Sequence, residues 1–170
     1  MLNDDRVNDF ETFVERWLAP AHRHATLAYP FADTDSVLLE VFSVVAHGVD
    51  LSPAPTVRAG LFRIVRSVAL RNAHDVFEFK RRNADAVAFA LHDAASTLDD
   101  AGRRHVEATV GALVQLRVDQ REVLRLVTLD DLDSDELGWI LGVTVEVATK
   151  TARDATEALR SQTRAAGETR

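Results

Sequence analysis

The stretch that decides the fold is Asp130–Ser161, DDLDSDELGWILGVTVEVATKTARDATEALRS. Asp133 or Ser134 can cap a short helix, because their side-chain oxygens accept hydrogen bonds from the free N–H groups at a helix start. Gly142 ends that helix, as glycine does where the chain takes a left-handed turn. A second, longer helix follows, which Thr144 can cap. Two helices joined by a short turn that contains glycine predict a helix-turn-helix.

Helical spacing also dominates the rest of the chain, and the alternation typical of β-strands is almost absent. Glycine, serine and two prolines in residues 48–56 indicate a loop. Asp33 is a candidate cap for the helix that follows it. Apolar residues at steps of three and four predict helices over residues 8–28, 36–46, 57–79, 105–116, 120–128 and 144–159. We therefore expect an all-α protein.

The 170 residues suit one ordinary domain or two small ones. We expect two small helical domains, residues 1–82 and residues 104–170, of which the second contains the helix-turn-helix. The Ala-rich, lower-complexity stretch at residues 83–103 is the expected linker between them.

Composition excludes several classes of protein. The chain is 46% hydrophobic and has no cysteine, so it can bury a core but forms neither disulfides nor a thiolate metal site. No apolar run approaches the roughly 20 residues that span a bilayer. The start, MLNDDRVNDF, lacks the basic-then-apolar order of a secretory signal. We expect a cytoplasmic protein without membrane insertion.

Nothing in the sequence indicates catalysis or metal binding. His22 and His24 point to different sides of a helix, and no HExxH, phosphate-binding glycine loop or nucleophile elbow occurs. We therefore expect no enzyme activity, no metal and no cofactor, and we expect the six histidines to be surface or titrating groups. Trp17 and Trp139 are expected in the core or at a domain interface.

The charge is unevenly distributed. The net charge of -7 argues against broad nucleic-acid binding, but residues 58–82 hold seven basic and two acidic side chains. Arg63 and Arg66 are three apart and share a helix face, as a basic groove for a single strand requires. The same two residues also suit an ordinary solvated helix face, and the run Lys80–Arg82 suits a helix C-terminus.

The second half resembles a known domain. Residues Ala112–Arg160 are similar to the promoter −35 reading domain of the extracytoplasmic-function (ECF) sigma factors of bacterial RNA polymerase. The similarity is contiguous over about fifty residues, without an insertion. The matching residues are Leu116, Gln120, Arg121, Glu122, Val123, Leu132, Glu136, Ile140, Leu141, Gly142, Val145, Leu159 and Arg160.

The first half resembles the −10 domain of the same family. Residues Thr34–Gly48 match the segment that grips the polymerase, and Val57–Asn72 match the helix that follows the base-capture loop. The loop here, residues 48–56, contains no aromatic residue. This sequence departs from the family pattern at Ser36, Leu39, Gly60 and Ser67, and Gly60 stands where the family has tryptophan.

The resemblance implies an ECF-type sigma factor that binds core RNA polymerase and promoter DNA, with an anti-sigma factor as a further partner. Polymerase docking would fall on Asp35, Val37, Leu38, Glu40 and Phe42. Contact with −10 DNA would involve Arg58, Arg63, Arg66 and Arg71. Contact with −35 DNA would involve Thr144, Thr149, Lys150, Thr151 and Arg153.

The expected recognition helix carries no net charge. Residues Val145–Arg160 contain three basic and three acidic side chains, so −35 binding is expected to be weak. Together with Ser36, Leu39 and Gly60, this neutrality favours an alternative hypothesis. The alternative is a degenerate sigma-like regulatory protein that binds polymerase, a sigma factor or an anti-sigma factor without reading promoters.

Overall fold

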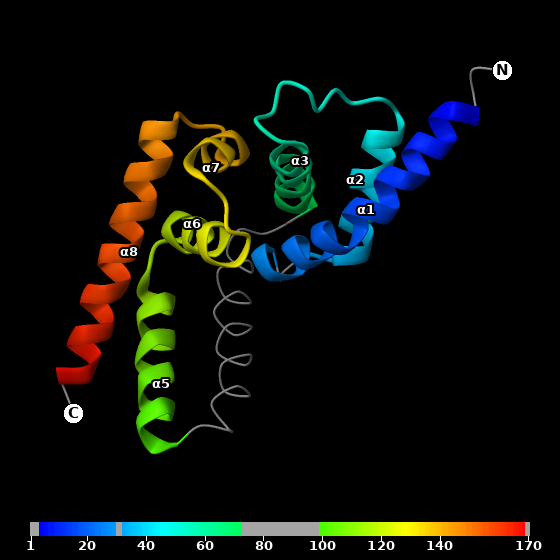
Figure 1. The fold of residues 1–170 in the computed structure, drawn as a ribbon. Coiled ribbons are helices and arrows are strands. Elements are labelled where there is room, and N and C mark those ends of the chain that lie inside the picture. Colours follow the sequence, from blue (N-terminus) through cyan, green and yellow to red (C-terminus); the bar gives the residue numbers. More distant parts are fainter. Residues whose placement is uncertain (1–3, 30–31, 73–98, 169–170) are drawn as a thin grey trace.

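The computed structural model describes residues 4–29, 32–72 and 99–168, and in these ranges it contains seven α-helices and no strand (Figure 1). The expected all-α class is confirmed. The end of the predicted helix 57–79, the Lys80–Arg82 cluster and most of the predicted linker 83–103 lie outside the described residues. The helices are α1 (Asp4–Ala28), α2 (Thr34–Ala46), α3 (Val57–Asn72), α5 (Asp100–Gln115), α6 (Val118–Leu129), α7 (Ser134–Leu141) and α8 (Val145–Glu168).

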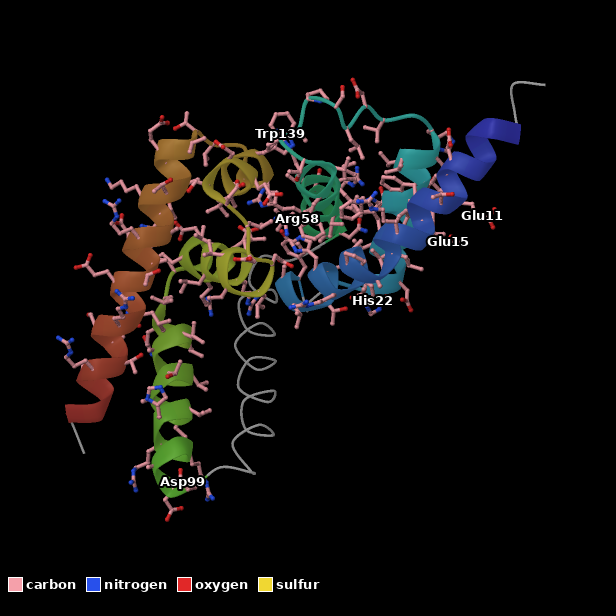
Figure 2. The ribbon with its side chains drawn as sticks, viewed as in Figure 1. Glu11, Glu15, His22, Arg58, Asp99 and Trp139 are labelled. Carbon is pink, nitrogen blue, oxygen red and sulfur yellow. The ribbon has the colours of Figure 1, made fainter. Side chains whose placement is uncertain are left out.

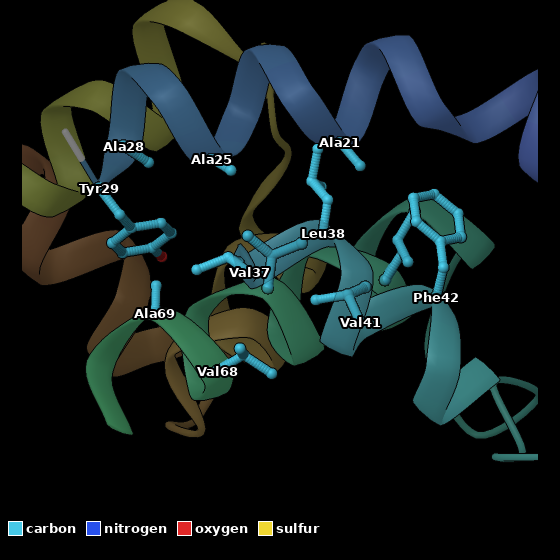
Figure 3. Close-up of a cluster of buried hydrophobic side chains, with 12 residues drawn as sticks. Ala21, Ala25, Ala28, Tyr29, Val37, Leu38, Val41, Phe42, Val68 and Ala69 are labelled. Atoms are coloured by element: carbon cyan, nitrogen blue, oxygen red, sulfur yellow. The ribbon is translucent and has the colours of Figure 1, made fainter. Parts of the chain in front are cut away.

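The first three helices, called here the first helix group, share one hydrophobic core (Figure 3). Val37 and Val41 from α2 meet Leu61 and Val65 from α3, and each of these side chains is at most 1% exposed. Helix α1 covers them with small residues on its inner face, while Trp17 packs partly buried against the same core. The sequence prediction for Trp17 is therefore confirmed.

Helices α5 to α8 form the second helix group. Helix α8 packs along α5, α6 and α7 (Figure 1), and it can approach closely because Ala148 and Ala155 on its inner face are fully buried. Leu126, Leu137 and Ile140 fill the space between α6, α7 and α8.

The two groups are in direct contact through α3. Ala59 and Phe62 of α3 are buried in the core cluster of the second group, and Phe62 is only 2% exposed. Figure 1 shows α3 beside α7, with α1 passing close to α6. Helix α3 thus contributes side chains to two hydrophobic cores.

The helix boundaries follow local capping chemistry. Asp133 caps α7 by accepting from the Glu136 N–H at 2.8 Å, and Gly142 ends it with a left-handed φ of 71°, so both predictions are confirmed. Helix α5 starts earlier than expected, because the Asp99 side chain accepts from the Gly102 N–H at 2.7 Å. Helix α8 continues to Glu168, well past the expected end near residue 159.

Candidate functional site at the junction of the two helix groups

The junction between the groups is lined with charged side chains. Arg58, in the first turn of α3, donates from Nε to Oε1 of Glu136 at 3.1 Å and pairs through Nη2 with the other carboxylate oxygen. It also donates to the carbonyl oxygen of Asp130 at 3.2 Å. Figure 2 shows Arg58 at the centre of the molecule, between the two groups. Its predicted role in binding −10 DNA would require these contacts to open.

Glu136 is a buried acceptor, and its side chain is 3% exposed. The Thr56 hydroxyl donates to Oε1 of Glu136 at 2.6 Å and itself accepts from the Ala59 N–H. Burial acts to raise the pKa of Glu136, but the hydrogen bonds from Arg58 and Thr56 outweigh it and hold that pKa below its usual range. The same hydrogen bond raises the pKa of Arg58, so both partners stay charged.

A second ion pair links α3 to α6. Arg66 donates to both carboxylate oxygens of Glu122, at 2.8 and 3.2 Å, and the Tyr29 hydroxyl donates to Oε1 of Glu122 at 3.3 Å. Burial acts to lower the pKa of Arg66, but the hydrogen bond with Glu122 and the attraction of its charge together outweigh burial and raise that pKa. Burial, followed by the nearby Glu122 charge, raises the pKa of Tyr29.

Arg63 lies over the indole ring of Trp139. Its guanidinium carbon is 4.9 Å from the ring centroid, and Nη1 donates to the Trp139 carbonyl oxygen at 3.1 Å. Trp139 itself is half-buried against the core cluster of the second group. The expectation that Trp139 lies in the core or at an interface is confirmed. The side chain of Arg63 is exposed to solvent, but its guanidinium group contacts Trp139 of the second helix group. Arg63 therefore takes part in the junction as well as facing solvent.

Arg71 pairs within the first helix group. Its guanidinium binds the carboxylate of Glu40 on α2, and the two side chains are 59% and 40% exposed. Such an exposed pair contributes little to stability. The structure thereby brings together a residue predicted to bind −10 DNA and a residue predicted to bind polymerase.

The residues predicted to dock on polymerase divide into two sets. Val37, Leu38 and Phe42 are core residues, 1%, 5% and 8% exposed, and the assignment of these three to a surface contact is corrected because their side chains are already covered by the first helix group. Asp35 is exposed and Glu40 is half-buried. The surface that α2 leaves open includes these polar side chains and Leu39, which is 77% exposed.

The residues predicted to bind −35 DNA lie on the first half of α8, except Thr144, which directly precedes the helix. Thr144, Lys150 and Arg153 are exposed, whereas Thr149 and Thr151 are half-buried. The Thr151 hydroxyl donates to the Val147 carbonyl oxygen at 2.8 Å. In this arrangement the hydroxyl proton is not available to donate a hydrogen bond to DNA.

His24 was missed as a junction residue. The histidines were expected to be surface or titrating groups, and the surface alternative is wrong for His24. It is fully buried, and its Nδ1 lies 2.8 Å from a carboxylate oxygen of Asp130. Its ring stacks on Phe62 with centroids 3.9 Å apart and planes 2° from parallel. The sequence feature that indicates burial of His24 is its helical spacing from Ala21, Ala25 and Ala28, which share the inner face of α1.

The loop before α3 is held against that helix at Gly60. A Cβ added there would lie 3.1 Å from Leu51 Cδ2 and 3.2 Å from Ala54 Cβ. The absence of a side chain at Gly60 therefore lets the loop approach α3 more closely than a tryptophan would allow. Within the loop, Asp50 accepts from the Ser52 N–H at 2.8 Å.

Metal-binding clusters and membrane-spanning helices are both absent from the described residues, 4–29, 32–72 and 99–168. No group of three or more His, Asp or Glu side chains there is arranged to hold a metal ion. None of the helices in residues 4–29, 32–72 and 99–168 is both long and apolar enough to cross a membrane. No protein-family model matches the chain, and no curated protein matches it in sequence.

Proposed function

We propose that the protein is a transcription factor of the ECF sigma type, which binds core RNA polymerase and promoter DNA. In this proposal residues 1–82 act as the −10 domain, residues 104–170 act as the −35 helix-turn-helix domain, and residues 83–103 join them. It is a non-enzymatic, cytoplasmic role. An anti-sigma factor remains a proposed further partner.

The observation that carries the proposal is the geometry of α7 and α8. A short helix capped by Asp133 ends at the left-handed Gly142, and a longer helix begins at Val145. Glycine at position 138 lets the turn fold back closely on α7. A Cβ there would lie only 3.1 Å from the carbonyl oxygen of Val143 in the turn. Two helices joined in this way are the form in which helix-turn-helix proteins present a helix to DNA.

The ion pairs at the junction occupy two of the arginines that the proposed function assigns to −10 DNA. Arg58 and Arg66 bind Glu136 and Glu122 of the second helix group, so their guanidinium groups are not available to phosphates in this arrangement. Promoter binding would require the two groups to separate. Separation would also expose Phe62, whose burial is worth about 1.5–3 kcal/mol.

Because separating the two helix groups costs free energy, the structure also favours a second candidate function in which they stay together. A protein that keeps the two groups together would bind polymerase, a sigma factor or an anti-sigma factor and would not read promoters. The exposed Leu39 on α2 suits such a protein interface.

Run-off transcription with purified core polymerase and genomic DNA tests the proposal. Promoter-specific transcripts would support the sigma factor. Stable association with core polymerase in gel filtration, without transcripts, would support the regulator that does not read promoters. Failure to associate with core polymerase would contradict the sigma-factor proposal.

A further inference from the structure

Helix α8 buries one side and exposes the other. Ala148 and Ala155 are fully buried on the inner side, and Ala152 and Leu159 pack partly buried against the neighbouring cores. The outer side carries the charges. Its exposed charged residues are Glu146, Lys150, Arg153, Asp154, Glu157, Arg160 and Arg164.

Three arginines surround a hollow on this outer side. Arg153, Arg160 and Arg164 line a depression of about 580 Å³, together with the single carboxylate of Glu157. Small side chains leave the space between them open. These small lining residues are Ala152, Thr156 and Ser161.

These arginines differ from those at the junction. In the described part of the chain, no hydrogen bond or ion pair is formed by the guanidinium groups of Arg153, Arg160 and Arg164, whereas those of Arg58 and Arg66 are paired with Glu136 and Glu122. Three guanidinium groups around one carboxylate leave the hollow with a net positive charge. A guanidinium group binds phosphate through two parallel hydrogen bonds, so phosphate is the chemistry that this surface suits.

We propose that the outer face of α8 from Arg153 to Arg164, called here the arginine stripe, binds the phosphate backbone of duplex DNA. The inference rests on the proposed function and assigns its DNA contact to this face. At about 1.5 Å per residue the stripe is about 16 Å long. Duplex DNA carries about ten phosphates on its two strands over that length, so several phosphates lie within the span of the three arginines.

Phosphate contacts position a protein on DNA and carry no base-sequence information, so the contact made by the stripe itself is independent of base sequence. At the start of α8 the apolar Val145 and Val147 are 38% and 49% exposed, beside the exposed polar side chains of Thr144 and Lys150. The stripe was only partly visible in the sequence, because the predicted helix ended near residue 159 and left Arg164 outside it.

The test measures duplex binding by the full-length chain as a function of salt. The probe is a fluorescent DNA duplex of about 20 base pairs, and the readout is anisotropy between about 25 and 200 mM salt. The variant Arg153→Gln/Arg160→Gln/Arg164→Gln should bind at least about tenfold more weakly at low salt, and the slope of log K against log salt should flatten by about 2 to 3. The variant should lose affinity by the same factor on a duplex of scrambled sequence.

A charge-matched variant controls for the loss of three positive charges. Arg16→Gln/Arg104→Gln/Arg117→Gln removes three exposed arginines from other parts of the surface and should leave the slope nearly unchanged. Equal loss in both variants, an unchanged slope in the stripe variant, a loss in the stripe variant that depends on the DNA sequence, or no duplex binding by the wild-type chain would overturn the inference. Gel filtration with core polymerase is measured on the wild-type chain and on the same variants. Failure of the wild-type chain to associate would count against the proposed function itself, whereas association of the wild-type chain together with any overturning DNA result would show that only the stripe has failed.

Discussion

Arg58 on α3 and Glu136 on α7 form an ion pair whose carboxylate is almost fully buried, and the pair joins the two helix groups. Removing the partner of a buried charge costs about 3–5 kcal/mol. Arg58 is about one-third exposed and can partly rehydrate, so we expect Glu136→Ala to lower the free energy of unfolding by about 3 kcal/mol, the lower end of that range. Urea denaturation followed by circular dichroism measures the change.

The neighbouring residue provides the control. Asp135 is exposed in the first turn of the same helix, so Asp135→Ala should cost less than about 1 kcal/mol. Equal effects of the two substitutions would contradict the assignment of Glu136 as the buried anchor of the junction.

Stability should depend on pH through Glu136. Because its pKa is lower in the folded protein, the unfolded chain takes up the proton first, and stability falls as the pH drops below the ordinary glutamate value of about 4.3. We expect the stability difference between wild type and Glu136→Gln to be full above that pH and to shrink below it. Asp33, Asp50 and Glu146 also have lowered pKa values, but they are common to both proteins and cancel in the difference.

Unfolding curves of the two proteins between about pH 3 and pH 7 measure this difference. A difference that stays constant over the whole range would show that the Glu136 carboxylate has the same pKa in both states.

His24 offers a separate probe of the junction. His24→Phe retains an aromatic ring to stack on Phe62 but leaves the carboxylate of Asp130, which is 9% exposed, without its hydrogen bond from Nδ1. A buried group left unsatisfied costs about 1–3 kcal/mol, and we expect a loss of that size in thermal or urea unfolding. His22→Phe on the exposed face of the same helix should change stability by less than about 0.5 kcal/mol. A His24→Phe protein as stable as wild type would contradict the role of this hydrogen bond.

Local features were predictable from the sequence, and long-range partners were not. Asp133 and Gly142 act on the backbone within a few residues of themselves, so their roles follow from residue type and spacing. The partners of the arginines depend on how α3 meets α6 and α7: 78 residues separate Arg58 from Glu136, and 56 separate Arg66 from Glu122. No local pattern specifies such pairs.

Burial set a second limit on sequence reasoning. The polymerase-docking assignment came from the resemblance of residues 34–48 to a sigma-factor segment. Such a match of residue types does not distinguish an exposed apolar side chain such as Leu39 from buried ones such as Val37 and Leu38. The histidines were treated alike for the same reason, although His24 shares the inner face of α1 with alanines. Whether a side chain is buried depends on the side chains that pack against it from other helices, and a local sequence pattern does not identify those.

The loop before α3 should be sensitive to any side chain at Gly60. Gly60→Trp introduces a side chain whose Cβ already approaches Leu51 and Ala54 closely, so the loop must move, and we expect a loss of about 1–3 kcal/mol and faster proteolysis within residues 48–56. Gly111→Trp is the matched control, because a Cβ at Gly111 meets nothing within 4 Å. Equal stability of the two variants would show that the loop does not depend on Gly60.

Releasing the junction arginines should increase binding to single-stranded DNA. Glu122→Gln/Glu136→Gln removes the two carboxylates that neutralise Arg66 and Arg58. Each guanidinium group that then contacts a phosphate should steepen the slope of log K against log salt by about 0.7, so the double variant should be steeper than wild type by about 1.4. Anisotropy of a labelled single strand measures both affinity and slope.

The increase must be separated from the effect of net charge. Glu11→Gln/Glu15→Gln removes two carboxylates from the exposed surface of α1 (Figure 2), and it makes the same change in net charge without freeing either arginine. Because electrostatic attraction at a distance is screened within about 8–10 Å at moderate salt, this control should bind the single strand much like wild type. If both double variants gain affinity equally, the gain reflects overall charge, and the carboxylates at the junction do not compete with nucleic acid for Arg58 and Arg66.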